Sequence, residues 1–322
     1  MNHLDNLKDE FLSFLRNNKD KRFAISTHSK ADIDTLSCAY AVSSVFPNST
    51  VVVPDELNLS ATALAEKLGI KFQLIKDVDR KKFDGMIVVD TSAYALLKEA
   101  KDWNIVLIID HHRADGRDMK FENGLFDEKS PSCAEVVFNI LPELKDKKIA
   151  FALACAVIAD GARFKSARKE TFETLAKLMD IAGVDYPELL GFAEPEVGLD
   201  VKAAVMKACQ RLQYVVIGNY VVVTSEVSSS ESDSAAFLSE VADVAFIGSF
   251  KEKDHEVRIS ARARKHVSVP LNEVMKSVAV SFGGNGGGHA KAAGAAIPKS
   301  GKYIEVQDIL KRCVEEFQNR LS

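Results

Sequence analysis

The sequence has no long apolar run and no excess of basic residues. Its longest strongly apolar stretch, residues 149–159, is too short to cross a bilayer, which takes about 20 residues. The 42 lysines and arginines are balanced by 46 aspartates and glutamates, which gives a net charge of −4. Proteins that coat long nucleic acids usually carry a basic surplus. We therefore expect no membrane partner, and any nucleic-acid substrate should be short and held in a pocket.

Cysteine patterns typical of zinc sites or disulfide frameworks are absent. The five cysteines form no Cys-x-x-Cys pair and leave an odd one over, which favours reduced thiols packed in helices. The first 15 residues place four leucines and Phe11 among charged residues, which predicts an amphipathic surface helix rather than a signal peptide. These features predict a cytoplasmic protein.

Between residues 20 and 185, short apolar runs alternate with helical stretches. The predicted strands are 23–27, 50–53, 72–75, 86–90 and 105–109. The predicted helices are about 34–46, 59–69, 93–101, 132–141, 146–159 and 168–182. Strands that are buried on both faces read as continuous apolar runs, so the alternation predicts an α/β fold in which helices wrap a parallel sheet.

A second, smaller α/β domain is predicted after a helix at 201–213. Its elements are a strand or hairpin at 214–224, a serine-rich loop at 225–234, a helix at 235–241, strands at 244–250 and 255–263, a glycine-rich stretch at 283–288 and a final helix from about Val306. We accordingly expect a catalytic domain at 1–190, a linker at 191–213 and a substrate-binding domain at 214–322. The active site is expected in the cleft between the domains.

Acidic and histidine residues directly follow several apolar runs. They are His28, Asp32 and Asp34 after 23–27, Asp90 after 86–89, Asp110, His111 and His112 after 105–109, and Asp160 after the apolar segment that ends at residue 159. The carboxyl ends of parallel strands open onto one crevice, so these groups should meet. Imidazole with carboxylate suits a mid-row divalent metal such as Mn²⁺, and so many acids would repel one another without cations.

Each cluster also has a structural alternative. Asp32 or Asp34 could cap the following helix, Asp90 could cap the next one, and Asp160 could stand in a helix C-terminal turn. Adjacent histidines in an extended segment point to opposite sides, so one should bind metal while the other faces the substrate. Asp110 could then orient an imidazole. The Ser132-Cys-Ala-Glu135 segment is interpreted as a helix-capping box.

Two features of the second domain suit an anionic ligand. Glycines at 283–288 before His289 let a backbone approach a ligand closely, whereas a flexible linker is the alternative. Arg258, Ser260, Arg262 and Arg264 alternate at period two, so they share one strand face. Arginine suits phosphate, and an ordinary solvated edge strand is the alternative.

Together these motifs resemble those of the DHH phosphoesterase superfamily, in the two-domain form with a DHH-associated C-terminal domain. In chain order the motifs are His28-x-x-x-Asp32-x-Asp34, Asp90, Asp110-His111-His112, Asp160 and Gly287-Gly288-His289-x-x-Ala292-Ala293-Gly294. Length and domain plan look most like the nano-RNase and pAp phosphatase branch. Two departures, Ser29-Lys30-Ala31 without the common proline and Asp160-Gly161-Ala162 in place of Asp-Thr-Gly, remove no ligand.

The resemblance implies a role for each residue. One Mn²⁺ ion would be held by His28, Asp32 and Asp90, and a second by Asp34, Asp90, His111 and Asp160. His112, with Asp110 beside it, would be catalytic and contact the scissile phosphate. Substrate binding would fall to Arg258, Ser260, Arg262, Gly287, Gly288 and His289. Mg²⁺ and Co²⁺ are alternative cofactors, and a homodimer is expected because proteins of this branch are often dimeric.

The implied activity is a manganese-dependent phosphodiesterase of the oligoribonuclease or exonuclease type. It would trim short RNA or DNA oligonucleotides, or linear dinucleotides such as pApA, to mononucleotides by two-metal activation of water. Alternatives at the same site are a pAp phosphatase, a cyclic-dinucleotide phosphodiesterase, and a polyphosphatase or pyrophosphatase. A further alternative is a nucleic-acid-binding protein without turnover.

Overall fold

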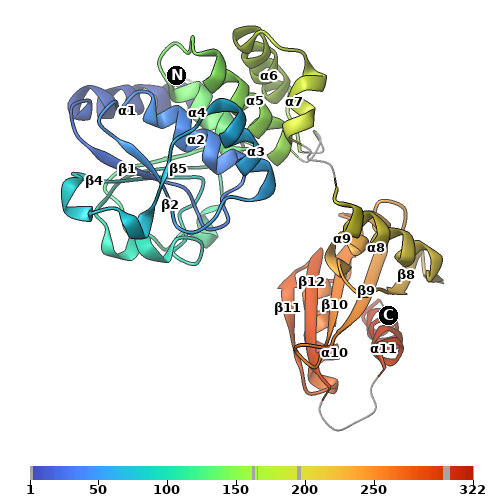
Figure 1. Ribbon diagram of the computed structural model, residues 1–322. Coiled ribbons are helices and arrows are strands. Elements are labelled where there is room, and N and C mark those ends of the chain that lie inside the picture. Colours follow the sequence, from blue (N-terminus) through green and yellow to red (C-terminus); the bar gives the residue numbers. More distant parts are fainter. Residues whose placement is uncertain (1–2, 162–163, 165, 194–196, 300–304, 322) are drawn as a thin grey trace. The chain divides into compact units, whose positions relative to one another are not determined.

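A computed structural model of the chain describes residues 3–161, 164, 166–193, 197–299 and 305–321. It divides into two compact units, Met1–Glu196 and Val197–Ser322. Each unit is built on a six-stranded sheet with helices packed against it (Figure 1). The limits 1–190 and 214–322, the linker between them and a cleft between the domains stay predictions.

The sheet of the first unit is parallel throughout. Its strands are β1 (Phe23–Ser26), β2 (Thr50–Val53), β3 (Gln73–Leu74), β4 (Gly85–Val89), β5 (Ile105–Asp110) and β6 (Gly124–Phe126). Their order is β3-β2-β1-β4-β5-β6. The predicted parallel sheet is confirmed, and β6 is an additional edge strand. Because β1, β4 and β5 are neighbours, the residues that follow them emerge side by side.

Helices cover one face of this sheet. They are α1 (His3–Asn18), α2 (Ile33–Ser43), α3 (Leu59–Leu68), α4 (Cys133–Ile140), α5 (Lys147–Asp160), α6 (Lys169–Ala182) and α7 (Tyr186–Ala193). The core lies between this layer and the sheet, and α5 is buried from residue 149 to 158. Loops with 3-10 turns cover the other face. The helix predicted at 93–101 is wrong, because only a 3-10 turn, Lys98–Asp102, forms there.

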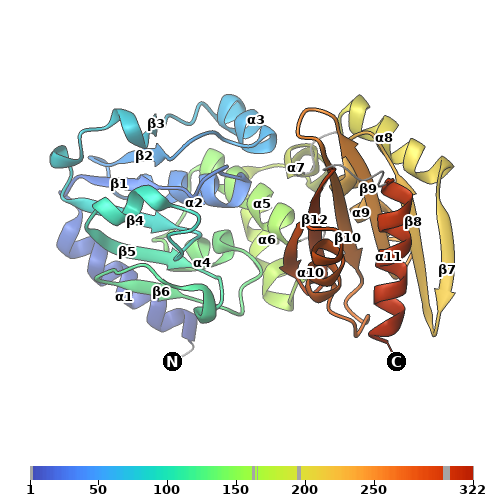
Figure 2. The same cartoon turned by 90° about the horizontal axis from the view of Figure 1, so that it is seen from below.

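The second unit has a mixed sheet. Its elements are α8 (Leu199–Gln210), β7 (Gln213–Ile217), β8 (Tyr220–Glu226), α9 (Glu231–Leu238), β9 (Val244–Lys251), β10 (Glu256–Ala263), α10 (Leu271–Ser281), β11 (Asn285–His289), β12 (Ala292–Pro298) and α11 (Val306–Asn319). The order is β11-β12-β10-β9-β8-β7, and only the β8–β9 pair is parallel. Helices α10 and α11 pack on one face, and α8 and α9 on the other (Figures 1 and 2).

Two alternatives considered for this unit are excluded. The glycine-rich stretch is not a flexible linker, because its residues from Asn285 onward form strand β11, which pairs with β12. The edge-strand alternative for residues 256–263 is wrong, since β10 lies between β9 and β12. The sequence did not predict strand β11 because glycine is uncommon in strands. Among the helices of the described residues, none has the length and apolar character needed to cross a membrane.

Candidate metal centre

Asp90 lies at the centre of a cluster formed where three neighbouring strands end. Its Oδ2 atom is 3.5 Å from Nε2 of His28, which follows β1, and its Oδ1 atom is 3.4 Å from Nε2 of His111, which follows β5. Asp32 joins His28 and Asp90 in a group whose potential ligand atoms lie within 4.8 Å of one another. We refer to His28, Asp32 and Asp90 as the first metal group.

A second group contains Asp34, His111 and Asp160, with ligand atoms within the same 4.8 Å limit. His111 Nε2 is 3.5 Å from Oδ2 of Asp160. Asp160 is the last residue of helix α5. The helix predicted at 146–159 is thereby confirmed, and this carboxylate comes from the end of a helix rather than from a strand. We refer to these three residues as the second metal group, which adjoins Asp90 through His111.

The two histidines are oriented by backbone carbonyls. His28 Nδ1 donates to the carbonyl oxygen of Ser29 at 2.9 Å, and His111 Nδ1 donates to that of Ser130 at 3.0 Å. A carbonyl can only accept, so Nδ1 carries the hydrogen in both rings and Nε2 faces the carboxylates. Metal-binding histidines in proteins usually have this arrangement.

Two of the aspartates also hold helix N-termini. Asp32 caps α2 by accepting from Thr35 N at 3.1 Å, so its capping role and its place in the first metal group coexist. Asp34 is buried, and it accepts from the backbone N–H groups of Cys133 at 2.7 Å and Ala134 at 2.9 Å at the start of α4. The bond to Cys133 joins residues that are 99 positions apart in the sequence and fixes the orientation of the Asp34 carboxylate.

Asp90 itself is strained and under-coordinated. Its φ of 62° is left-handed, a conformation that non-glycine residues adopt at a cost and that clusters at functional sites. Its Oδ1 atom is buried and makes no well-formed hydrogen bond to any described residue. A buried carboxylate oxygen between two histidines and further acids fits a cation.

The charges of the cluster fit cations as well. Burial lowers the pKa of His28 and His111, but the nearby carboxylates, Asp90 foremost, outweigh burial and raise these pKa values to about 9 and about 10. Burial, with Asp90 and other acids, raises the pKa of Asp34 well above its ordinary value and that of Asp160 to about 6. Without metal, protons therefore occupy the positions that cations would take.

Metal binding at pH 7 should accordingly release protons. His28 and His111 are protonated below pKa values of about 9 and about 10, and each must lose a proton to expose Nε2. We expect at least about two protons per pair of Mn²⁺ ions and an affinity that rises with pH up to about 10. Titration calorimetry in buffers of different ionisation enthalpy measures this release. Binding without proton release, or weaker binding at higher pH, would contradict the assignment of these histidines as ligands.

Asp110 and His112 form a pair that adjoins the cluster, because His112 Nδ1 is 3.9 Å from Asp90 Oδ1 and His112 forms a third potential ligand group with Asp90 and His111. The rings of His111 and His112 have centroids 4.4 Å apart, so the two side chains lie on the same side, and the expectation that they point to opposite sides is wrong. Asp110 is fully buried, and its Oδ1 atom accepts from His112 Nδ1 at 2.7 Å and from two backbone N–H groups. Its Oδ2 atom accepts from Ser92 Oγ at 2.7 Å. Burial raises the pKa of Asp110, but His112 and Ser92 outweigh it and hold the pKa at about 2. Asp110 is thus an anion that keeps His112 Nε2 facing outward.

Five of the six predicted substrate-binding residues of the second unit share one sheet face, whereas Gly288, which pairs with the buried Ala293, lies on the other. Strand register places Arg258 beside Ala296 and Asn285, Ser260 beside Gly294 and Gly287, and Arg262 beside Ala292 and His289. The partly exposed small residues between the outer strands are Gly287, Ala292, Gly294 and Ala296. We call these four residues the small-residue floor. Helix α9 packs on β9 and β10 of this face, beside the floor (Figure 1).

The side chains around the floor differ in how free they are to contact a ligand. Arg258 donates to Glu256 at 2.6 Å and to Asp254 at 2.9 Å, so its charge is compensated by two carboxylates. Arg262 donates to Ser232 Oγ and His289 is exposed. Gly288 has a φ of 127° and an added Cβ there would meet the backbone of Ala292 at 2.7 Å, which indicates a conformational role.

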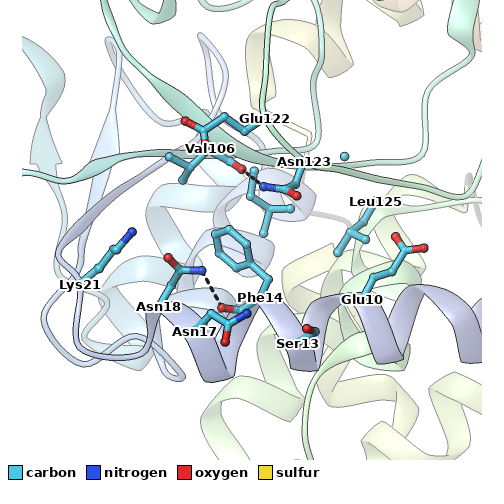
Figure 3. A pocket seen from close by; sticks show the side chains of 12 residues that line it. Glu10, Ser13, Phe14, Asn17, Asn18, Lys21, Val106, Glu122, Asn123 and Leu125 are labelled. Atoms are coloured by element: carbon cyan, nitrogen blue, oxygen red, sulfur yellow. Dashed lines mark hydrogen bonds between the residues drawn. The ribbon is translucent and has the colours of Figure 1, made fainter.

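A polar pocket of about 610 Å³ lies elsewhere in the first unit, between α1, β5 and β6 (Figure 3). Asn18 and Asn123 line it, and their amides are occupied by the carbonyls of Phe14 and Val106. The pocket contains none of the predicted site residues. Sequence reasoning missed Ser92 and Ser130 because a hydroxyl or carbonyl that supports a ligand leaves no spacing signal.

Two family models match the chain. The model of the DHH family, N-terminal domain, matches residues 22–159, which include both histidine motifs and Asp90. The model of the DHHA1 domain matches residues 217–316, which include the small-residue floor. Together they account for most of both units.

One relative and two solved structures are similar to this chain over most of its length. An uncharacterized protein of Methanocaldococcus jannaschii is 29% identical over 308 residues, which cover 90% of this chain and 92% of the relative. An exopolyphosphatase-related protein from Bacteroides fragilis has a TM-score of 0.72 at 16% identity, covering 98% of this chain and 96% of that one. A pGpG-specific phosphodiesterase from Vibrio cholerae has a TM-score of 0.50 at 14% identity, covering 92% and 99%.

Proposed function

This chain belongs to the two-domain DHH phosphoesterase family, whose members are metal-dependent hydrolases, and we propose that it hydrolyses short oligonucleotides or linear dinucleotides with Mn²⁺. One observation carries the proposal. Two groups of histidine and aspartate residues meet around the buried carboxylate of Asp90, whose Oδ1 atom makes no well-formed hydrogen bond to a described residue. Imidazole and carboxylate together suit a mid-row divalent ion, with Mg²⁺ and Co²⁺ as alternatives.

The chain's own residues would divide the work around these ions. The first metal group and the second metal group would each hold one cation, with Asp90 shared between them. When bound, such a pair lowers the pKa of a water molecule and clamps phosphoryl oxygens. His112 is half-exposed, and its hydrogen bond to Asp110 raises its pKa. A protonated Nε2 would therefore donate to a phosphoryl oxygen as negative charge develops there.

The small-residue floor favours a nucleotide substrate over polyphosphate. Glycine and alanine side chains leave a flat surface on which a base can lie, with Arg262 on one side and His289 on the other. Arg262 on β10 and His289 on β11 are two strand spacings apart, roughly 10 Å. A polyphosphate chain would need several free cations, whereas Arg258 is already paired with two carboxylates. The Vibrio cholerae neighbour, which is specific for the dinucleotide pGpG, is consistent with this preference.

A substrate panel tests the proposal. The protein should be incubated with Mn²⁺ and, separately, with pApA, pGpG, labelled RNA of two to seven nucleotides, pAp, cyclic di-AMP, pyrophosphate and polyphosphate. We expect the highest kcat/KM for the linear dinucleotides and the shortest RNA. Fastest turnover of polyphosphate or pyrophosphate would reject the nucleotide assignment. Tight binding of long strands without turnover would support a binding protein instead.

Adding one methyl group to the floor should weaken substrate binding without disturbing the fold. An added Cβ at Gly287 would meet no atom within 4 Å, so Gly287→Ala should fold normally. We expect KM for pApA to rise about tenfold with kcat nearly unchanged, because one methyl group in a close-fitting site is worth about 1–3 kcal/mol. Gly191→Ala, also in open space, is the matched control and should leave KM unchanged. Equal KM values for both variants would remove the floor from the substrate site.

A further inference from the structure

One short segment, residues 130–135, which covers the end of the β6–α4 loop and the first turn of α4, supports most of the second metal group. The carbonyl oxygen of Ser130 accepts from His111 Nδ1 at 3.0 Å. The N–H groups of Cys133 and Ala134 donate to the two oxygens of Asp34 at 2.7 and 2.9 Å. Two of the three ligands in this group are thus oriented by backbone atoms of the same segment. A shift of this segment would move both ligands together.

The first metal group is supported differently. His28 is oriented by the carbonyl oxygen of the next residue, Ser29. Asp32 accepts from Thr35 N three residues further on, within the first turn of α2. These supports are local to the β1–α2 connection and do not involve residues 130–135. The two metal groups therefore differ in which part of the chain sets their geometry.

Arg168, directly before α6, connects to the 130–135 segment from outside. Its Nη2 atom donates to Ser130 Oγ at 3.4 Å and lies 3.7 Å from Oε2 of Glu135. Ser130 Oγ in turn donates to Asp127 Oδ2 at 2.9 Å. Glu135 is only 1% exposed, and a buried carboxylate needs a partner that compensates its charge. Arg168 therefore contacts both ends of the segment that orients His111 and Asp34.

We propose that Arg168 is a positioning residue for the second metal group. By holding Ser130 and Glu135 it would keep residues 130–135 in place, so that its loss weakens cation binding at Asp34, His111 and Asp160 and spares His28, Asp32 and Asp90. The inference rests on the proposed two-metal centre. A purely structural role, in which Arg168 only neutralises Glu135, would lower stability without separating the two metal affinities.

A Mn²⁺ titration of metal-stripped protein tests the proposal. Calorimetry gives the affinities of the two binding steps, and electron paramagnetic resonance distinguishes single from paired Mn²⁺. Asp160→Asn and Asp32→Asn identify which step belongs to which group. Arg168→Met should weaken the step lost in Asp160→Asn about tenfold, the lower range for residues that orient ligands. The other step should change less than about threefold, which is within the effect of a surface substitution.

Two further variants separate positioning from general damage. Arg168→Lys keeps the positive charge and should recover part of the lost affinity. Lys169→Met removes the neighbouring exposed cation, which pairs with Glu173 at 3.0 Å, and should leave both steps unchanged. If Arg168→Met does not fold, Ser130→Ala removes the hydroxyl that Arg168 contacts but keeps the carbonyl that orients His111. Ser130→Ala should also weaken Mn²⁺ binding at the second metal group and spare the first, with a smaller loss of affinity than Arg168→Met.

The outcomes distinguish this inference from the proposed function. Equal weakening of both steps, no weakening of either, or a lower melting temperature with both steps intact would overturn the role of Arg168 while the two-metal centre stands. Wild-type protein that binds fewer than two Mn²⁺ ions would overturn the metal centre itself, and the proposed function with it.

Discussion

Asp90→Asn should lower kcat for pApA at least about 10³-fold, because the residue shared by both metal groups loses its charge. Asparagine has the same shape and tolerates the left-handed conformation that Asp90 adopts, with a φ of 62°. The backbone at the end of β4 should therefore stay in place. Circular dichroism of the metal-free variant should show a folded protein. In thermal melting, the melting temperature of the variant should no longer rise when Mn²⁺ is added.

Asp118→Asn is the matched control for this substitution. Asp118 is exposed and accepts from Tyr94 N at 2.7 Å, a bond that an asparagine oxygen retains. We expect kcat and the Mn²⁺-dependent rise in melting temperature to match wild type. An Asp90→Asn enzyme that kept more than about a tenth of wild-type kcat would show that Asp90 is not the shared ligand.

Asp110→Asn should have the second-largest effect, a fall in kcat of about 10²-fold with Mn²⁺ affinity nearly unchanged. Asp110 is an anion that fixes His112 through Nδ1 and lies outside both metal groups. An asparagine oxygen can still accept from His112, but the lost charge lets the pKa of His112 fall and weakens its donation to phosphate. Steady-state kinetics with a parallel Mn²⁺ titration separates the two effects.

Ser92→Ala provides the comparison for Asp110→Asn. It removes the hydroxyl that donates to Asp110 Oδ2 but leaves the carboxylate and His112 paired. We expect a fall in kcat of less than about tenfold, because the carboxylate keeps its charge and its bond to His112, and the lost hydrogen bond acts on His112 only through Asp110. A larger loss of activity in Ser92→Ala than in Asp110→Asn would mean that the pair acts through packing rather than charge.

The site residues could be placed from the sequence because their positions follow from strand topology. Asp90 and the histidines after β1 and β5 stand at the ends of adjacent parallel strands, and such ends meet in any sheet of this order. Asp160 was placed by a different signal, because the segment before it was predicted as a helix at 146–159, and α5 spans Lys147–Asp160.

The supporting atoms could not be predicted, because most of them belong to the backbone. The carbonyl of Ser130 and the N–H groups of Cys133 and Ala134 would look the same with other side chains. In the second unit, β11 was missed because a strand containing three consecutive glycines has the composition of a loop. Only its register against β12 shows that Gly287 and His289 share a face with Ser260 and Arg262.

Anomalous diffraction at the manganese edge, from crystals grown with Mn²⁺, tests the central claim most directly. We predict two peaks about 3.5–4 Å apart, one beside His28 and Asp32, the other beside Asp34, His111 and Asp160, and both in contact with Asp90. A single peak, or peaks remote from Asp90, would contradict a two-metal phosphoesterase centre in this chain.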